Sequence, residues 1–431
     1  MTFFPQAQEV DAEQLLRQAD QAMYQAKQAG KNQYHMFDAV HDIHLRGQLE
    51  SLQRIGLALQ RQEFVLYYQP KVNLRTGAVV GAEALIRWQH PERGLLAPGS
   101  FLPLVEDHAL AVDIGQWVLQ SALAQMVAWQ EQGLHLPVSV NVGARQLQQA
   151  DFVHFLRACL ASYPSLAPAD LQFEVLETSA LEDIGHVTEV MAQCRALGVT
   201  FALDDFGTGY SSLTYLKRLA VAQLKVDQSF VRDMLDDPDD LSILVGVLDM
   251  SASFQRQVIA EGVETSAHGR MLLRLGCELA QGYGIARPMP AQAMPAWCQG
   301  WTQDAQWQDV PVVSKRDLPI LFASAEHRAW VAALQNYLTG RSPHVVALDA
   351  HRCNVGQWID GGGLQHHPDR QAVARVVDLH GQIHAMAQTL CQGQAAQPGA
   401  TAVQAQLPQL LALRDQLLDA LEALLSGATP G

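Results

Sequence analysis

Two adjacent carboxylates, Asp204 and Asp205, directly follow the apolar run Thr200–Leu203 and precede a loop that contains Gly207 and Gly209. The apolar run has the length of a buried strand, so the two carboxylates are predicted at its carboxyl end. Paired carboxylates in such a position are suited to hold Mg²⁺ or Mn²⁺. A solvated Asp-Asp turn is the simpler interpretation of the dipeptide alone, so the rest of the chain must decide between the two.

A protein kinase is the first alternative, because Asp205-Phe206-Gly207 matches the kinase magnesium motif. Kinases also need a glycine-rich loop, a strand lysine and a catalytic-loop aspartate earlier in the chain. The sequence before residue 204 contains none of these, which excludes the kinase interpretation.

The composition of the 431 residues limits the remaining classes of protein. The length predicts two or three domains. The formal charge of −15 argues against a general nucleic-acid binder, although a small phosphorylated substrate could still be reached through metal ions. No apolar run is long enough to span a membrane, and Met1–Asp20 lacks the layout of a signal peptide. Six scattered cysteines fit a reduced compartment, so we expect a cytoplasmic protein.

Strand-like and helix-like segments alternate through the middle of the chain. The strand-like segments are Phe64–Gln69, Ala82–Arg87, Pro137–Val142, Leu171–Glu177, Thr200–Asp204, Gln223–Val226, Gln257–Ala260 and Leu279–Gly284. Helical patterns such as Phe101–Glu131, Arg145–Ser162 and Leu241–Phe254 lie between most of them. Eight strands with interleaved helices predict an α/β fold, a (β/α)8 TIM-like barrel; an open doubly wound sheet is the alternative.

Polar side chains lie on or just after seven of these predicted strands. They are Glu83, Arg87, Asn141, Glu174, Glu177, Asp204, Asp205, Lys225, Asp227, Glu261, Glu264 and Gln281. The carboxyl ends of barrel strands carry the active sites of such folds. Buried charges cost several kcal/mol unless they are paired or bound to metal, so a purely structural explanation of the whole set is poor.

Seven short motifs give the middle of the chain its resemblance to a known family. They are Tyr68-Gln69-Pro70, Glu83-Ala84-Leu85-Ile86-Arg87, Val140-Asn141, Asp204-Asp205-Phe206-Gly207-Thr208-Gly209, Leu224-Lys225-Val226-Asp227, Ala260-Glu261-Gly262-Val263-Glu264 and Gln281-Gly282-Tyr283. In this order they resemble EAL domains, which hydrolyse cyclic di-GMP, and the resemblance covers roughly residues 45–298. Leu176 departs from it, because the family usually has a threonine there, near the loop that helps to close the metal site.

The resemblance implies a catalytic site with two Mg²⁺ or Mn²⁺ ions. Glu83, Asn141, Glu174 and Asp204 would hold one ion, and Asp204, Asp205 and Glu261 the other. A water between them would attack phosphorus and yield the linear dinucleotide pGpG, with Lys225 positioning that water or offsetting charge. Gln69, Arg87, Glu264 and Gln281 would contact the substrate, Arg87 through a phosphate oxygen. Oxygen-rich ligation without histidine or cysteine favours these ions over Zn²⁺.

The first 62 residues read as a fragment and a connector. Ala12–Ala29 has a helical apolar stripe, and Ala19–Lys27 with Gly30-Lys31-Asn32 resembles the last helix of GGDEF (diguanylate cyclase) domains. Nothing matches the Gly-Gly-Asp/Glu-Glu-Phe loop of that family. We expect residues 1–38 to be the C-terminal remnant of a GGDEF domain whose upstream sensory region is missing, and 39–62 to be a connector helix.

A second, smaller unit is expected over residues 321–391, after a polar linker at 299–320. His327, Cys353 in Cys353-Asn354-Val355-Gly356-Gln357-Trp358, and the pair His380 and His384 are laid out as in the chemoreceptor zinc-binding (CZB) domain, an all-α bundle. The resemblance implies one structural or regulatory zinc on these four residues. Four other histidines of the unit, His344, His351, His366 and His367, have no place in that pattern and are expected to be exposed.

The last 40 residues, 392–431, are expected to be a flexible segment followed by an amphipathic helix at Gln409–Leu425, packed on the bundle or on its twin in a homodimer. The sequence therefore predicts a cytoplasmic cyclic di-GMP phosphodiesterase that responds to zinc. A non-catalytic cyclic di-GMP receptor and a zinc-dependent dimerisation scaffold are the alternatives.

Overall fold

A computed structural model of the chain describes residues 2, 11–28, 34, 36, 39–178, 184–209, 213–365, 367–396 and 401–426. These residues form two compact units. The first unit combines Met1–Val65 with Ile86–Gln116, and the second combines Leu66–Leu85 with Trp117–Gly431. Strands β1 (Phe64–Asn73) and β2 (Val79–His90) each contribute residues to both units.

The first unit consists mainly of helices and contains a small aromatic cluster. Its elements include α1 (Ala12–Gln28), α2 (Ala39–Gln60), β3 (Gly94–Leu96), α3 (Leu102–Val105) and the start of α4 (Leu110–Glu131). The rings of Phe64, Trp88 and Phe101 lie 5.4–5.8 Å apart. The Glu63 carboxylate accepts hydrogen bonds from Trp88 Nε1 and from Arg54, so this acidic group beside the aromatic rings is paired.

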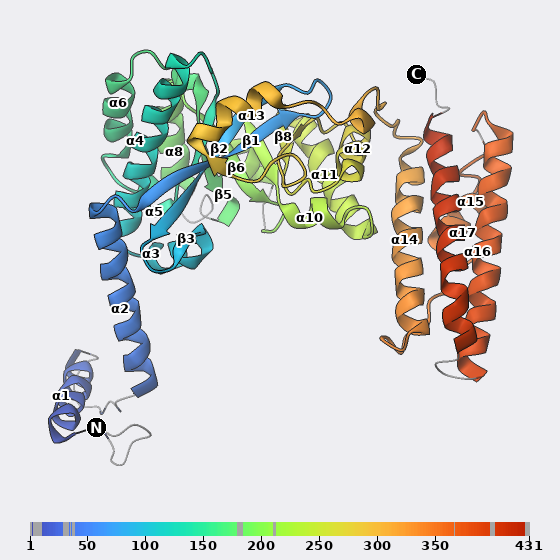
Figure 1. Cartoon of the computed structure of the whole chain (residues 1–431), viewed down its shortest axis with the longest axis horizontal. Coiled ribbons are helices and arrows are strands. Elements are labelled where there is room, and N and C mark those ends of the chain that lie inside the picture. The colour runs from blue at the N-terminus through green and yellow to red at the C-terminus, as the bar shows by residue number, and fades with distance from the viewer. Residues whose placement is uncertain are drawn as a thin grey trace. The chain divides into compact units, whose positions relative to one another are not determined.

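The chain folds into a closed barrel of eight strands, which confirms the predicted fold class (Figure 1). After β1 and β2, the barrel strands are β4 (Val138–Asn141), β5 (Leu171–Leu176), β6 (Thr200–Phe206), β7 (Gln223–Val226), β8 (Gln257–Ala260) and β9 (Leu279–Ala280). Neighbouring strands from β2 through β9 pair in parallel, and a pairing of β1 with β2 closes the barrel.

Strand β1 differs from an ideal (β/α)8 barrel, because it runs antiparallel to β9. The turn between β1 and β2 occupies only residues 74–78, which is too short for the crossover that parallel neighbours require. The side chain of Asn73 closes that turn by accepting from the amides of Arg75 and Thr76. Short strands β3 and β10 (Met289–Pro290) extend the sheet beside β2 and β1.

Helices follow most strands and cover the outside of the barrel. They include α5 (Ala144–Leu147), α6 (Phe152–Ser162), α8 (Ile184–Ala196), α9 (Leu213–Arg218), α10 (Gln228–Asp233), α11 (Pro238–Ser253), α12 (Ser266–Arg274) and α13 (Met294–Gly300). Phe152 of α6 packs against Phe173 of β5, which in turn contacts Phe201 of β6. This apolar layer holds neighbouring strands in register and thereby fixes where their polar ends lie.

The segment 299–320, which we expected to be a polar linker, is packed on the barrel. Trp307 is buried, and its Nε1 donates to the carbonyl of Ser266. A Cβ at Gly269 would lie 2.3 Å from that nitrogen, so only glycine leaves room for the indole. Trp301 donates to the carbonyl of Gly77. The tryptophans that the sequence scatters through this segment therefore anchor it.

The C-terminal region is a bundle of helices, as expected. They are α14 (Leu318–Leu338), α15 (Asn354–Asp360), α16 (Arg370–Ala396) and α17 (Thr401–Ser426). Helix α17 lies beside α14 and α16 (Figure 1) and buries a stripe of leucines that includes Leu410, Leu417, Leu421 and Leu424. Helix therefore covers 392–396 and 401–404, where we expected a flexible segment.

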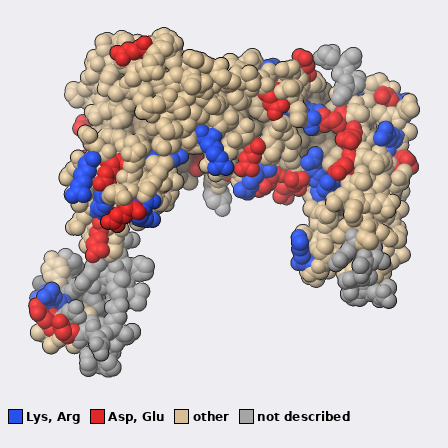
Figure 2. Space-filling view, in the orientation of Figure 1, with Lys and Arg blue, Asp and Glu red and all other residues tan. Residues whose placement is uncertain are grey.

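Two properties of the described residues bear on possible partners. None of their helices combines the length and the apolar content that a bilayer crossing demands. On the face drawn in Figure 2, basic and acidic side chains are interspersed rather than gathered in one basic stripe. This distribution, like the net charge, gives no support to a phosphate-backbone binding surface on that face.

Candidate functional site

The carboxyl ends of the parallel strands bring the predicted polar side chains together. The register sets Asn141 of β4 opposite Glu174 of β5, and Leu176 at the end of β5 opposite Asp204 of β6. Glu83 lies on β2, Lys225 on β7, and Glu261 and Gln281 directly follow β8 and β9. Parallel pairing makes these strands end at one edge, so residues far apart in the sequence share one site.

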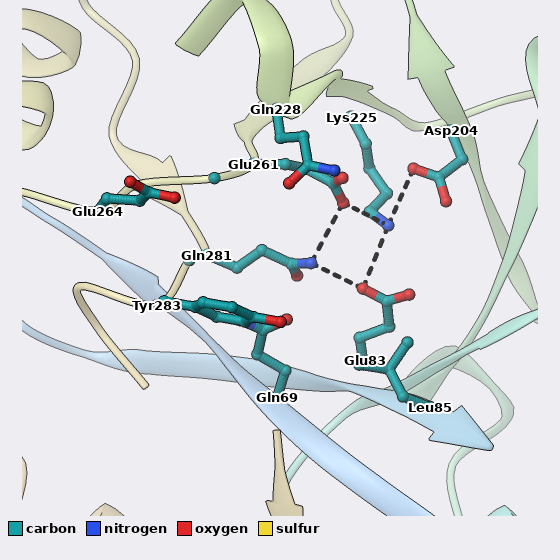
Figure 3. A pocket seen from close by; sticks show the side chains of 12 residues that line it. Gln69, Glu83, Leu85, Asp204, Lys225, Gln228, Glu261, Glu264, Gln281 and Tyr283 are labelled. Carbon is teal, nitrogen blue, oxygen red and sulfur yellow. Dashed lines mark hydrogen bonds and ion pairs between the residues drawn. The ribbon is translucent and has the colours of Figure 1, made fainter. Parts of the chain in front are cut away.

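A cavity of about 240 Å³ opens over this set (Figure 3). Its lining consists of Gln69, Glu83, Leu85, Asp204, Lys225, Gln228, Glu261, Gly262, Glu264, Gln281, Gly282 and Tyr283. Most of these side chains are polar, and many are carboxylates or amides. The lining therefore offers oxygen ligands and hydrogen-bonding groups rather than an apolar binding surface.

Lys225 is the centre of the cluster. Its ammonium Nζ lies 2.6 Å from Glu261, 3.0 Å from Asp204 and 3.3 Å from Glu83 (Figure 3). It also lies 2.6 Å from Glu174. The side chain is almost completely buried. One positive charge is thus shared among four carboxylates, an arrangement that leaves a surplus of negative charge.

The pKa values of the cluster reflect that surplus. Burial and the neighbouring Glu174 raise the pKa of Glu83, and burial raises the pKa of Glu261 to about 8. Burial also raises the pKa of Asp204 and of Asp205, the latter with Asp227 as the next cause. Although burial opposes the charge, Glu174 and Glu261 raise the pKa of Lys225 well above its usual range. A nearby cation would stabilise the ionised form of these carboxylates and lower their pKa values.

Two groups of three carboxylates have the spacing to hold a cation. One consists of Glu83, Glu174 and Asp204, and the other of Asp204, Asp205 and Glu261; within each group the ligand atoms lie within 4.8 Å of one another. Asn141 donates from Nδ2 to Glu83, so its amide lies next to the first group. All-oxygen donor sets of this kind fit Mg²⁺ or Mn²⁺, and Asp204 belongs to both groups.

The backbone at the end of β6 adopts an uncommon conformation. Asp205 has a φ of 52°, in the left-handed region that non-glycine residues rarely adopt, and its amide donates to the Asp204 carboxylate. Gly207 follows with a φ of 105° and donates its amide to buried Glu177. A Cβ at Gly209 would lie 2.6 Å from the same carboxylate, so Glu177 anchors this loop. Tyr210, Ser211 and Ser212, which follow in the sequence, lie outside the described residues.

The expected substrate contacts divide into two groups. Gln69, Glu264 and Gln281 line the cavity; Gln281 donates to both Glu83 and Glu261, and Gln69 donates to the carbonyl of Ala286. Arg87 lies farther along β2, in the first unit, where its guanidinium donates to the carbonyl of Ile86. The expected phosphate contact of Arg87 therefore stays a prediction.

Sequence reasoning missed three polar residues. Gln228 and Tyr283 line the cavity, and Lys71 lies beneath it with its Nζ 2.5 Å from Glu174. The alternation of β1 could have identified Lys71, because residues 69 and 71 of a strand point to the same face. Tyr283 stands within a motif that we had quoted only for its glutamine, and the guanidinium of Arg287 lies 4.6 Å from its ring centre.

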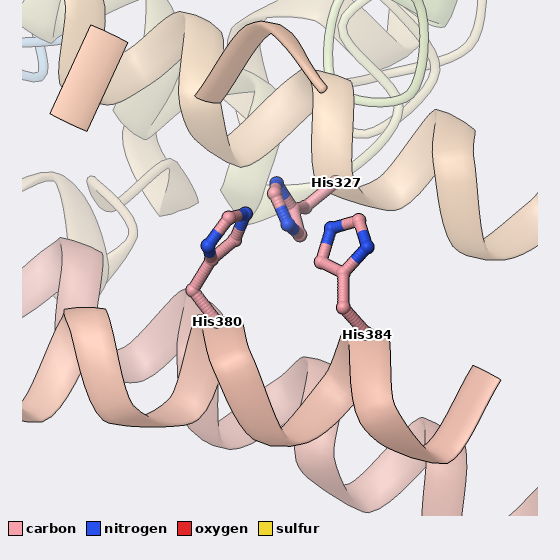
Figure 4. Close-up of side chains that lie close together, drawn as sticks. All are labelled: His327, His380 and His384. Atoms are coloured by element: carbon pink, nitrogen blue, oxygen red, sulfur yellow. The ribbon is translucent and has the colours of Figure 1, made fainter. Parts of the chain in front are cut away.

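A second cluster lies within the helical bundle, where three of the four predicted zinc ligands lie close together (Figure 4). His327 of α14 and His380 and His384 of α16 offer ring nitrogens within 4.8 Å of one another. The thiol of Cys353, at the start of α15, lies 3.2 Å from His380 Nε2. Three imidazoles and one thiol are the donor set of a closed tetrahedral zinc site.

The hydrogen bonds of this cluster leave ligand atoms free toward its centre. His384 contacts the carbonyl of Leu348 through Nδ1 at 3.0 Å, while its buried Nε2 has no protein partner among the described residues. Both ring nitrogens of buried His327 likewise have none there. Unpaired polar atoms are costly in a protein interior, and a bound cation would satisfy them.

The imidazoles of the cluster are poised to stay neutral. Burial, with His380 and His384 alongside, lowers the pKa of His327 to about 3. Burial and His384 lower the pKa of His380 to about 4, and burial raises the pKa of the Cys353 thiol. Neutral imidazole is the form that binds zinc, whereas the thiol must lose its proton on binding.

The remaining histidines of the bundle divide differently from the expectation. His344 and His351 are exposed, as expected. His367 is not: it is buried, with Nε2 3.0 Å from the carbonyl of Leu424 in α17. The sequence showed no partner for it because that carbonyl belongs to a distant helix. His366 lies outside the described residues.

Comparison with family models agrees with both sites. The EAL domain matches residues 52–288, and the chemoreceptor zinc-binding domain matches residues 327–391. The first match covers more than half of the chain and contains the whole carboxylate cluster. The second contains all four residues of the histidine and cysteine cluster.

Similar proteins carry names from one signalling system. The bifunctional diguanylate cyclase/cyclic di-GMP phosphodiesterase MucR of Pseudomonas aeruginosa is 42% identical over 284 residues, which cover 66% of this chain and 41% of MucR. The cyclic di-GMP phosphodiesterase PdeR of Escherichia coli is 36% identical over 296 residues, which cover 68% of this chain and 44% of PdeR. The chain thus spans less than half the length of these two relatives.

Solved structures show the same likeness. The PaMucR phosphodiesterase in complex with c-di-GMP is 42% identical with a TM-score of 0.55, covering 57% of this chain and 99% of that one. The EAL enzyme Bd1971, bound to cAMP and cyclic di-GMP, is 28% identical with a TM-score of 0.57, covering 68% of this chain and 77% of that one.

Proposed function

The chain belongs to the EAL domain family, and from this premise we propose that it hydrolyses cyclic di-GMP to linear pGpG. The observation that supports the proposal is the cluster of carboxylates around Lys225, which brings together Glu83, Glu174, Asp204 and Glu261. MucR and PdeR, whose names include this phosphodiesterase activity, are relatives in the region that holds the cluster.

Two divalent cations are part of the proposal, and the residues fit them. Glu83, Asn141, Glu174 and Asp204 would hold one, and Asp204, Asp205 and Glu261 the other. When bound, such cations supply a water that loses its proton near neutral pH and positive charge for the phosphate. Mg²⁺ and Mn²⁺ are the ions that this all-oxygen donor set favours.

The chain's own side chains would orient the reacting groups. Lys225 is buried with its ammonium at the centre of the carboxylates, where it can hold a water in place and offset charge that develops on phosphorus oxygens. Gln281 spans Glu83 and Glu261 and keeps one buried amide oxygen without a protein partner among the described residues, available to a ligand. Gln69 and Glu264, on the cavity wall, would contact the nucleotide, and Arg87 a phosphate oxygen.

Zinc is the proposed regulatory ion. His327, Cys353, His380 and His384 would hold one zinc per chain and cross-link α14, α15 and α16. Since the ligands come from separate helices, binding would tighten the bundle, and a change in its packing could alter the rate of hydrolysis. We further propose that the protein acts as a homodimer and that residues 1–38 derive from a GGDEF domain.

A non-catalytic receptor of cyclic di-GMP is the second candidate. It differs from an enzyme in losing the ligands that hold the catalytic cations. None of those positions is altered here, and the enzyme therefore remains our proposal.

Product analysis tests the proposal directly. The full chain is incubated with cyclic di-GMP and Mg²⁺ or Mn²⁺, with and without a chelator selective for zinc, and the nucleotides are separated by chromatography. We expect a metal-dependent conversion to pGpG whose rate changes when zinc is removed. Binding of cyclic di-GMP without any conversion would favour the receptor, and a rate indifferent to the zinc chelator would refute zinc control while leaving the enzyme in place.

A further inference from the structure

Lys71 is a buried lysine that lies outside every role assigned so far. It projects from β1 on the same face as Gln69, one pleat deeper in the barrel. Its Nζ lies 2.5 Å from Glu174 Oε1, 2.7 Å from Ser139 Oγ and 3.4 Å from Gln172 Oε1. These partners are on β4 and β5, so the side chain reaches across the interior of the barrel beneath the carboxylate cluster.

Glu174 needs this second partner because it is completely buried. Its Oε2 contacts Lys225, but that ammonium is shared with three other carboxylates. Its Oε1 contacts Lys71, for which Glu174 is the one carboxylate within ion-pair distance among the described residues. The two oxygens of Glu174 are thus divided, one turned toward the centre of the cluster and one held from below.

Binding of a divalent cation would change the two contacts differently. A cation held by Glu83, Glu174 and Asp204 would compete with Lys225, which contacts the same three carboxylates, so Lys225 would give up part of its contact. Lys71 lies on the other side of Glu174 and does not compete. Lys71 would therefore stay paired with Glu174 when a cation takes the place of part of the Lys225 contact. It would keep the Glu174 carboxylate ionised and oriented.

We propose that Lys71 is a positioning residue of the cation site: by binding Oε1 of Glu174 it presents Oε2 to the ion and thereby sets the affinity for Mg²⁺ or Mn²⁺. This inference rests on the proposed function for the identity of the ions. It concerns binding, however, and can be measured without hydrolysis.

The decisive variant is Lys71→Met, which keeps the length of the side chain and removes its charge. We expect its affinity for Mn²⁺, measured by calorimetry without nucleotide, to fall by about tenfold, the size of a lost charged hydrogen bond. In hydrolysis assays the Mn²⁺ concentration for half-maximal rate should rise by a similar factor, while the rate at saturating Mn²⁺ changes much less. Lys315→Met, at an exposed lysine, is the matched control and should match the wild type.

Two further variants separate positioning from a merely structural role. Ser139→Ala keeps the charge of Lys71 but removes one of its hydrogen bonds, and should weaken Mn²⁺ binding by about threefold. Lys71→Arg keeps the charge and should bind Mn²⁺ more tightly than Lys71→Met. If folded Lys71→Met and Ser139→Ala both bind Mn²⁺ like the wild type, and only stability or maximal rate is lower, the proposal is wrong.

The two proposals fail in distinguishable ways. A wild-type chain that binds Mn²⁺ but does not convert cyclic di-GMP would refute the proposed function, and the affinities of the Lys71 variants would still support the positioning role. A wild-type chain that binds no Mn²⁺ would overturn the role of Lys71 itself.

Discussion

The barrel and the helical bundle each gather side chains that can hold a metal ion, but they compensate charge in opposite ways. In the barrel the groups are carboxylates, and buried Lys225 and Lys71 supply the positive charge. In the bundle the groups are imidazoles and a thiol. The imidazoles are neutral because burial lowers their pKa values, and the thiol is neutral because burial raises its pKa. The barrel cluster therefore remains ionic without metal, whereas the bundle cluster is neutral.

The comparison explains why the two clusters should select different ions and serve different purposes. A surplus of anionic oxygen favours hard ions that retain open positions for water and phosphate. Nitrogen and sulfur ligands on three helices favour zinc in a closed tetrahedron, whose energy of binding goes into holding the helices together. The following predictions test this division.

The largest effect is expected from removing a barrel carboxylate. Asp205→Asn or Glu83→Ala should lower the rate of hydrolysis by more than about a hundredfold. Losing a metal ligand should reduce activity more than losing a residue that only contacts a ligand. Circular dichroism should show an unchanged fold, and zinc content should stay at the wild-type level. Exposed Asp249→Asn serves as the control; wild-type turnover in Asp205→Asn would disprove the two-cation assignment.

A variant of the bundle should have the converse result. Cys353→Ala should reduce zinc from about one per chain to almost none, since a site with three ligands no longer closes the tetrahedron. We expect hydrolysis to persist but to lose its response to zinc. Elemental analysis of purified protein measures the first effect, with Cys298→Ala as the matched control outside the cluster. Equal zinc in the variant and the wild type would show that the thiol is not a ligand.

Acid should destabilise the bundle in metal-free protein. The pKa of His327 is about 3 when folded, against 6.5 for an ordinary histidine, so between these values the unfolded chain binds more protons. The contribution of His327 to the free energy of unfolding is therefore fully retained above about pH 6.5 and falls as the pH drops toward 3, by up to about 1.4 kcal/mol per pH unit.

Chelator-treated protein unfolded in urea at several pH values measures that slope. His327→Gln should reduce it, whereas His344→Gln, at an exposed position, should leave it unchanged. An identical slope in His327→Gln would show that another group accounts for the loss of stability.

The smallest effect is expected at Leu176, the departure from the family pattern. Its side chain is 38% exposed at the end of β5, and Glu177, not Leu176, holds the amide of Gly207. Leu176→Thr should therefore change hydrolysis by less than about threefold. A much larger gain in rate would contradict this expectation. It would show that Leu176 impairs the loop and that the loop limits the rate of hydrolysis.

Much of the site could be predicted because its residues follow apolar strands of recognisable length. The strand pattern before Asp204, Glu261 or Gln281 places each side chain at the carboxyl end of a strand. In a barrel of parallel strands these ends lie together. The cluster of histidines was predictable for a related reason, since His380 and His384 are spaced to share a helix face.

The predictions from the sequence that were wrong or missing concern contacts between distant segments. Trp307 and His367 have partners 41 and 57 residues away, and neither partner has a side-chain pattern that would reveal it, because both are backbone carbonyls. The sequence analysis also did not predict the direction of β1, since the apolar pattern of a strand is the same whichever way it runs. Only the short turn at residues 74–78 indicates the antiparallel pairing.

The sequence by itself determined which groups can bind metal, because ligand chemistry belongs to residue types and their place at the ends of periodic elements. Tertiary structure alone decided how those groups are charged and oriented. Lys225 and Lys71 come from different strands, and only barrel closure places one above and one below Glu174. Electrostatic energies depend on distance and burial, which arise when the strands pack and are not encoded in any local pattern.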